Sequence, residues 1–298
     1  MSEAIRYFHR ERGVLESEPV YGERWLRWAY ENPLGRLTVA AVAKRAWFSR
    51  WYGRRMSTAA SRRRIAPFVE TYGVDPREFA GPVSAFRSFN DFFVRKLRPE
   101  ARPIVADEGA LAFPADGRHL GFADVDEAPG IYAKGQRFSV RDLFAGSVES
   151  VPKRAAVVIS RLCPLDYHRF HFADAGRAGH PSSIPGDLFS VSPIALRRSL
   201  NYLFANKRVV TEIQHASGRT FWQVEVGATN VGGIVQTYEG NSPVERGTEK
   251  GFFHFGGSCV ITVFPADAVE LADDLCHHSA AQTELFAKMG ARMGRWRG

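Results

Sequence analysis

The stretch Lys250-Gly251-Phe252-Phe253-His254-Phe255-Gly256-Gly257-Ser258-Cys259-Val260-Ile261-Thr262-Val263-Phe264 decides how this sequence folds. Two aromatic and β-branched runs flank a Gly-Gly-Ser corner, a pattern that predicts two strands joined by a tight bend. Glycine tolerates strained dihedral angles and close backbone approach, so the hydroxyl of Ser258 is placed to attack the carbonyl of Gly257. The simpler alternative is a turn in which the serine hydrogen-bonds only its own backbone.

Length and composition favour a globular protein of the reducing cytosol. With 298 residues and 45% hydrophobic content, the chain is long enough to bury a large core. The 3 cysteines are odd in number and lack CxxC spacing, which argues against a disulfide framework and against a structural zinc site. We find no secretory signal, and no uncharged apolar run approaches the roughly 20 residues that span a bilayer.

Positive charge, +8 over the whole chain, is concentrated between residues 32 and 68, where no Asp or Glu occurs. Apolar residues recur there at helical spacings among aromatic rings, which is typical of a helix lying in an anionic membrane surface. Nucleic-acid binding and an ordinary solvated helical face are the alternatives, but no nucleic-acid recognition pattern is present. The residues predicted to bind the membrane are Trp47, Trp51, Arg62, Arg63 and Arg64.

The sequence divides into a helical N-terminal region and a β-rich remainder. Residues 22–72 predict two or three helices, and a further short helix, capped by Ser88, ends at Arg98-Pro99. A strand that ends in a Pro/Asp/Gly turn is predicted within 111–118. Further strands are predicted at 155–160, 207–214 and 221–237, where Gly227, Gly232 and Gly233 suggest a curved sheet. We therefore predict an α+β fold. Amphipathic helices form a membrane-associating region (residues 1–100), followed by a β-rich, barrel-like or sandwich-like catalytic domain (residues 101–298) with a short helical C-terminal tail.

Candidate chemistry lies on four residues far apart in the sequence: Asp116 in a turn, His168 and His171 after a strand, and Ser258 at the glycine corner. A serine is a weak nucleophile and needs an imidazole to take its proton, while a carboxylate orients the imidazole. The sequence alone leaves open whether these residues meet. Metal binding by the two histidines would need further ligands, which Asp166 alone does not supply, so we predict no metal.

The corner Phe255-Gly256-Gly257-Ser258, the run Asp166-Tyr167-His168-Arg169-Phe170-His171 and the turn Phe113-Pro114-Ala115-Asp116-Gly117 together resemble the phosphatidylserine decarboxylase family of pyruvoyl-dependent enzymes. The run from Phe89 to Pro99 supports the resemblance, which covers roughly residues 20 to 265 in the family's order. One departure is Cys259, where the family usually has Thr. Slower maturation is expected if the Thr hydroxyl assists cleavage.

The resemblance implies self-cleavage between Gly257 and Ser258, giving a β chain (residues 1–257) and an α chain (residues 258–298). In this reading His171, oriented by Asp116, is the base, and Ser258 becomes a covalent pyruvoyl group. The family's chemistry then implies a Schiff base between that group and phosphatidylserine, loss of carbon dioxide, and formation of phosphatidylethanolamine. His168 is expected to hold the substrate carboxylate or to reprotonate the carbon that loses it.

The expected partners are phosphatidylserine, an anionic membrane surface and the two chains of one precursor, without nucleic acid. We also expect a homodimer, bound peripherally at the cytoplasmic side of a bacterial cell membrane. One rival function is a serine hydrolase using Asp116, His171 and Ser258, although the G-x-S-x-G elbow is missing. The other is a non-catalytic protein that binds membrane surfaces.

Overall fold

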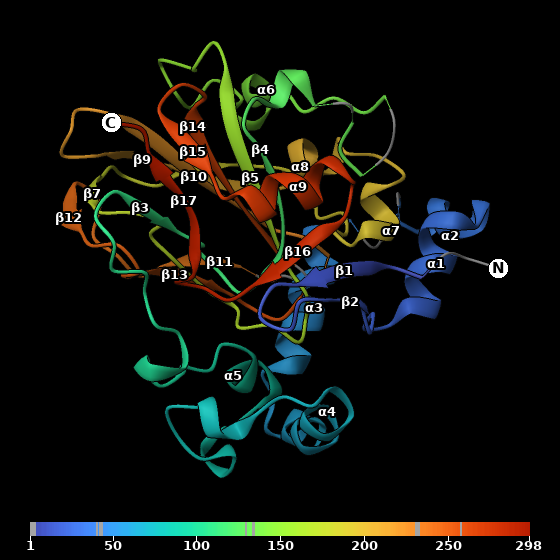
Figure 1. Ribbon diagram of the computed structural model, residues 1–298. Helices are drawn as coiled ribbons and strands as arrows, with labels where there is room; N and C mark the ends of the chain where they lie inside the picture. Colours follow the sequence, from blue (N-terminus) through green and yellow to red (C-terminus); the bar gives the residue numbers. More distant parts are fainter. Residues whose placement is uncertain are drawn as a thin grey trace.

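An 11-stranded sheet forms the centre of the molecule (Figure 1). The computed structural model describes residues 4–39, 41, 44–128, 130–132, 135–229, 233–256 and 258–298. The strand order is β12-β7-β9-β10-β14-β5-β4-β16-β1-β2, and β8 pairs with β9 outside this path. The strands are β1 (Arg6–His9), β2 (Val14–Ser17), β4 (Gly117–Phe122), β5 (Ala155–Leu162), β7 (Gly176–Ala178), β8 (Ser182–Ile184), β9 (Arg208–Gln214), β10 (Thr220–Val226), β12 (Ser242–Val244), β14 (Ser258–Pro265) and β16 (Glu284–Ala287).

Two smaller sheets flank the central one. The first has the order β11-β13-β6 and the second the order β15-β17-β3. Their strands are β11 (Ile234–Gln236), β13 (Glu249–Phe253), β6 (Arg169–His171), β15 (Val269–Leu271), β17 (Arg292–Trp296) and β3 (Ala110–Ala112). The predicted β-runs on either side of the glycine corner are therefore confirmed as β13 and β14. They are not a hairpin, however, because each pairs within a different sheet.

The middle of the central sheet is buried on both faces. β5 and β14 pair antiparallel from Ser258 opposite Leu162 to Pro265 opposite Ala155. Their side chains alternate between two separate apolar clusters, one containing Val157 and Ile159 and the other Ala156 and Val158. Strands covered on both faces have nearly continuous apolar sequences, which is why these two runs were recognisable from sequence.

Most helices of the N-terminal region lie beside and below the sheet in Figure 1. The contact between α1 and α2 requires Gly35, since a Cβ there would stand 1.9 Å from the carbonyl oxygen of Trp28. In the lower lobe, Ser88 caps α5 as predicted by accepting from the N–H of Asp91. The helices are α1 (Glu23–Glu31), α2 (Pro33–Thr38), α3 (Ala46–Met56), α4 (Ile65–Tyr72), α5 (Phe89–Phe93), α6 (Val140–Phe144), α7 (Pro193–Leu196), α8 (Tyr202–Ala205) and α9 (Asp273–Ala280).

Two predictions about the chain ends are wrong. The tail beyond residue 281 is not helical, because it forms β16 and β17, and residues 6–17 form β1 and β2 rather than part of a helical region. β1 runs parallel to β16 and pairs antiparallel with β2. These strands are only 4 or 5 residues long. β1, β16 and β17 are paired with strands far away in the sequence, so local patterns did not reveal them. The α+β class itself is confirmed.

Candidate active site

The glycine corner is anchored by the aromatic lobe. Phe255 packs in a cluster of phenylalanines contributed largely by α5 and its surroundings, with its ring 4.9 Å from that of Phe93. The N–H of Phe255 donates to the side-chain oxygen of Asn90 on α5 over 2.9 Å. Gly256 has a φ of 144°, a conformation that side chains rarely adopt. The predicted cleavage partner Gly257 lies outside the described residues.

Ser258 opens β14 directly after this corner. Its side chain is fully buried, and its hydroxyl has no hydrogen-bond partner among the described residues. A buried hydroxyl without a partner is costly, so such groups are few in folded proteins and require an explanation. The simple alternative, a serine that only satisfies its own turn, does not match this geometry.

His168 lies beneath the corner, fully buried against the ring of Phe93 with centroids 3.9 Å apart. Its Nδ1 lies 3.0 Å from the carbonyl oxygen of Asp166. Because a carbonyl oxygen can only accept, we assign the ring proton to Nδ1, which leaves a lone pair on Nε2. Nε2 is buried without a partner in the described structure. Burial lowers the pKa of His168 to about 3, with the backbone of Gly256 acting in the opposite direction, so the ring is neutral at pH 7.

His171 and Asp116 are both buried, but no hydrogen bond joins them in the described part of the chain. Asp116 instead accepts from the guanidinium of Arg102, at 2.6 Å for the shortest contact, and from the N–H of Met289. Burial lowers the pKa of His171 to about 4, and the charges of Glu249 and Asp116 oppose this effect. Asp116 therefore acts on His171 electrostatically, not through a direct contact.

The turn that carries Asp116 is shaped by its neighbour. A Cβ at Gly117 would stand 2.5 Å from the carbonyl oxygen of Arg161, so glycine is needed for the close approach of β4 to β5. This Asp-Gly pair therefore does more than form a turn. Ser258 pairs with Leu162 and Arg118 with Arg161, so Ser258 and the turn that carries Asp116 lie at the same end of β5. The N–H of His171 donates to the carbonyl of Pro114 in that turn. The described residues contain no hydrogen-bonded chain that links the three side chains.

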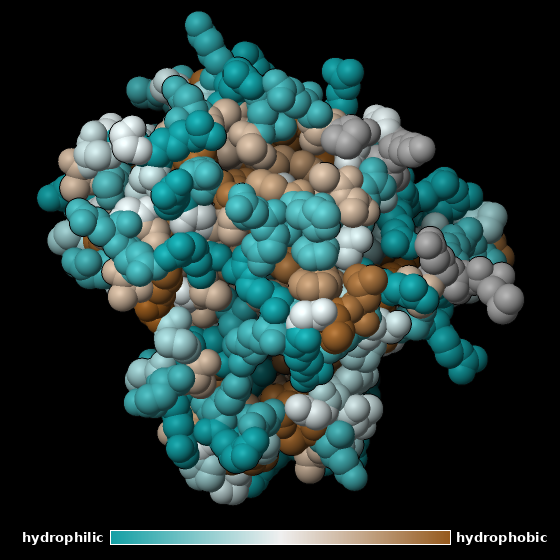
Figure 2. Space-filling model, in the orientation of Figure 1, coloured by the Kyte–Doolittle hydropathy of each residue, from teal (hydrophilic) through white to brown (hydrophobic). Residues whose placement is uncertain are grey.

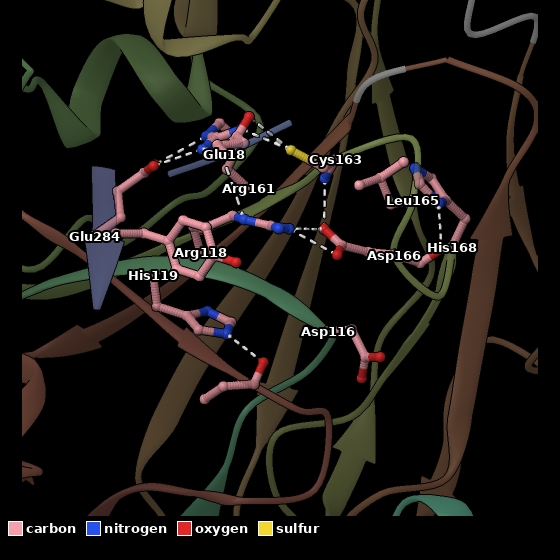
Figure 3. A network of polar contacts seen from close by, with 12 residues as sticks. Glu18, Asp116, Arg118, His119, Arg161, Cys163, Leu165, Asp166, His168 and Glu284 are labelled. Carbon is pink, nitrogen blue, oxygen red and sulfur yellow. Dashed lines mark hydrogen bonds and ion pairs between the residues drawn. The ribbon is translucent and has the colours of Figure 1, made fainter. Parts of the chain in front are cut away.

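A buried network of charges, which sequence reasoning missed, lies behind the site (Figure 3). The guanidinium of Arg161 binds Glu18 from the N-terminal region and Glu284 from β16, each at 2.5 Å. Arg118 binds Asp166 at 2.5 Å and approaches Glu18 at 3.4 Å. Burial alone would raise the pKa of Glu18, but the two arginines lower it to about 2. The available sequence signal was a pair of arginines inside strands that are covered on both faces.

The network reaches His168 through the turn between β5 and β6. The carboxylate of Asp166 accepts from Arg118 and, at 2.6 Å, from the N–H of Cys163. Its carbonyl accepts from His168. The same residue therefore fixes the turn with its side chain and orients the imidazole with its backbone. Within the described ranges, no three His, Cys, Asp or Glu side chains are grouped to hold a metal ion.

A largely apolar cavity of about 320 Å³ extends from the corner to the N-terminal helices. Its lining includes Gly256, Cys163 and the buried pair Glu18 and Arg161. The wall toward the helices is formed by Tyr21, Trp25, Leu26, Tyr30, Phe48 and Tyr52. Cavities that are mostly apolar with a few convergent polar groups are typical binding sites for small molecules.

Apolar side chains are exposed on the helices that cover this cavity. Leu34 is 70% exposed, Leu37 66%, Trp47 54% and Trp51 52%. Figure 2 also shows apolar surface near β2 and at the edge where α1 and α2 lie. The predicted cluster Arg62, Arg63 and Arg64 follows α3 in a turn of 3₁₀ helix, with Arg62 and Arg63 exposed. In the part of the chain that the structure describes, no helix has the length and apolarity needed to cross a bilayer.

Comparison with known proteins gives one family. The sequence profile described as phosphatidylserine decarboxylase matches residues 89–295. The chain is 41% identical over 295 residues to a phosphatidylserine decarboxylase proenzyme of Chlamydia muridarum, covering 99% of this chain and 98% of the relative. It is 38% identical over 295 residues to the proenzyme of the same name from Fusobacterium nucleatum, covering 98% of both chains. The chain therefore belongs to the phosphatidylserine decarboxylase family.

Proposed function

We propose that this protein is a phosphatidylserine decarboxylase that converts phosphatidylserine into phosphatidylethanolamine and carbon dioxide. The observation that carries the proposal is the buried hydroxyl of Ser258, without a partner among the described residues, directly after a glycine corner that a largely apolar cavity reaches. Its relatives are named proenzymes, which supports maturation from a precursor.

The proposed maturation begins at Ser258. Its Oγ attacks the carbonyl carbon of Gly257, a base takes the hydroxyl proton, and the peptide becomes an ester. Loss of the Ser258 α-proton then expels Gly257 as a carboxylate, ending the β chain (1–257), and leaves dehydroalanine at the head of the α chain (258–298). Water converts it to a pyruvoyl group and releases ammonia. His171 is our candidate base, since burial keeps its ring neutral at pH 7, with Asp116 as its electrostatic partner.

The residues around Ser258 fit such a group. No described hydrogen bond of the Ser258 hydroxyl has to be broken when that group is converted into a ketone. A pyruvoyl group at this position supplies a carbonyl that accepts the electrons left when carbon dioxide departs. We propose that Nε2 of His168 takes a proton from the substrate ammonium and later returns one to the substrate carbon, since that atom carries a lone pair and has no partner in the described structure.

The cavity and the exposed helices support a lipid substrate. The aromatic residues of α1 and α3 in the lining suit an acyl chain, and the buried Glu18 and Arg161 in the same lining suit a polar head group. Exposed Trp47 and Trp51, together with Arg62, Arg63 and Arg64, would hold this face against anionic lipid, with each cation near the surface contributing about 1 kcal/mol. We therefore propose peripheral attachment to the cytoplasmic side of the cell membrane. The homodimer remains a prediction.

The proposal is tested with wild type and three variants, Ser258→Ala, His171→Ala and His168→Ala. Splitting is followed on a denaturing gel, and carbon dioxide release from carboxyl-labelled phosphatidylserine in vesicles is measured separately. We expect wild type to split and decarboxylate, Ser258→Ala and His171→Ala to remain whole, and His168→Ala to split but decarboxylate poorly. Splitting of His171→Ala together with an unsplit His168→Ala would reverse the two roles. Wild type that splits without releasing carbon dioxide would refute the proposed reaction.

A further inference from the structure

Arg95, two residues after α5, is a buried arginine without a carboxylate partner. Its side chain is 5% exposed, and Nε and Nη1 have no hydrogen-bond partner in the described structure. Nη2 donates weakly to the carbonyl oxygens of Leu165 and Asp166, at 3.2 and 3.3 Å. By contrast, three other buried arginines, Arg102, Arg118 and Arg161, all bind carboxylates at 2.5 to 2.6 Å.

The carboxylates nearest to Arg95, those of Asp116 and Asp166, are bound by Arg102 and Arg118. A buried charge that binds no carboxylate directly is costly, and aromatic rings compensate only in part. The guanidinium carbon of Arg95 lies 5.3 Å from the ring centroid of Phe79 and 5.0 Å from that of Phe92. A methionine would fill this aromatic site without the cost of burying a charge. The arginine is therefore best explained by an effect of its charge and its donors on a neighbouring group.

That neighbouring group is His168. The Asp166 carbonyl that accepts from Arg95 is the same oxygen that accepts from Nδ1 of His168. A second donor on this oxygen fixes its position and polarises it, which orders the turn that carries the imidazole. Phe93, on α5, covers the ring at a centroid distance of 3.9 Å, so the helix that precedes Arg95 also confines His168.

The charged groups around His168 come from three segments. Arg95 follows α5, Asp116 precedes β4, and Asp166 belongs to the same turn but directs its carboxylate to Arg118. The positive charge of Arg95 disfavours a protonated ring, whereas Asp116 favours one. Removing only the arginine should therefore raise the pKa of His168, while burial continues to hold it below the ordinary value.

We propose that Arg95 is a positioning residue for His168. It holds the carbonyls of residues 165 and 166 so that the imidazole keeps its proton on Nδ1 and a free lone pair on Nε2. The catalytic use of that lone pair rests on the proposed function, but the state of the imidazole does not. The two ideas can therefore fail separately.

The test is ¹⁵N-histidine NMR of the unsplit Ser258→Ala protein, with the His168 signal assigned by its loss in His168→Gln. With Arg95 present, the signal should show the Nδ1–H tautomer and no titration down to pH 5. In Arg95→Met we expect a mixture of the Nδ1–H and Nε2–H tautomers at neutral pH, because the carbonyl that accepts from Nδ1 is no longer held in place. Arg95→Lys, which keeps the charge and one donor group, should restore most of the original state. A His168 signal unchanged in Arg95→Met would overturn the proposal.

Two further readouts separate positioning from general stability. Arg208→Met is the matched control, because Arg208 is also buried and donates to backbone carbonyls, including those of Leu143 and Phe204. It should destabilise the fold without moving the His168 signal.

In otherwise native protein, Arg95→Met should split normally and lower kcat at least tenfold with little change in KM, and Arg95→Lys should recover part of kcat. Equal losses in Arg208→Met and Arg95→Met would assign Arg95 a purely structural role. Wild type without decarboxylase activity but with the expected NMR result would refute the proposed function alone.

Discussion

Replacement of Glu18 by Gln tests the buried charge network most sharply. The side chain is 2% exposed and accepts from Arg161 at 2.5 Å, and its pKa is lowered from 4.5 to about 2. A depression of that size corresponds to about 3 kcal/mol of folding free energy at pH 7. Breaking a buried ion pair on one side independently predicts about 3–5 kcal/mol. We therefore expect Glu18→Gln to lower the free energy of unfolding by about 3 kcal/mol.

The stability lost in Glu18→Gln should decrease as the pH falls. A carboxyl group with a depressed pKa contributes its full stability above the unfolded value of 4.5, and the contribution is lost as pH falls toward about 2. Urea unfolding of the Ser258→Ala protein, with and without Glu18→Gln, should therefore show a difference that is constant from pH 8 to 6 and shrinks below pH 4.5. Glu270→Gln, which breaks the exposed pair with Arg295, is the control and should cost at most about 1 kcal/mol. A cost for Glu18→Gln no larger than that of the control, or one that grows in acid, would refute the reasoning.

Three other predictions concern the cavity, the membrane surface and the core. Leu26→Trp should fill part of the cavity and raise KM for phosphatidylserine several-fold while splitting continues, and a KM equal to that of wild type would contradict a role of the cavity in binding the lipid. Trp47→Ala with Trp51→Ala should weaken sedimentation with anionic vesicles, and retention equal to wild type would remove both residues from the proposed membrane surface. Phe92→Ala, at a fully buried position of the aromatic cluster, should cost about 3–5 kcal/mol in urea unfolding, and a loss under 1 kcal/mol would contradict the packing described.

Sequence alone predicted the parts of the fold that depend on local pattern. β5 and β14 are nearly continuous apolar runs, and α5 carries its own cap, so each was recognisable without its partners. β16 and β17 were missed because pairing with distant strands, not local propensity, makes them strands. The same limitation explains why β1 and β2 were placed in a helical region.

The candidate site was predicted in kind but not in its contacts. The sequence showed a glycine corner with a serine and a run with two histidines, and these motifs indicated the site. The burial of Ser258 and His168 agrees with a reactive site. The partner of Asp116 could not be read from sequence, because Arg102 reaches it only after the chain folds back. The charge network was equally hidden, since it joins residues as far apart as Glu18 and Glu284 through Arg161.

The central claim is that residue 258 leaves the precursor as the blocked end of a separate chain. Intact mass spectrometry of the active wild-type protein under denaturing conditions measures this directly. The account predicts two species, residues 1–257 and residues 258–298, the second lighter by one ammonia than a fragment that begins with free serine and reactive toward carbonyl reagents. A single species with the mass of the unmodified 298-residue chain, from protein that decarboxylates phosphatidylserine, would contradict it.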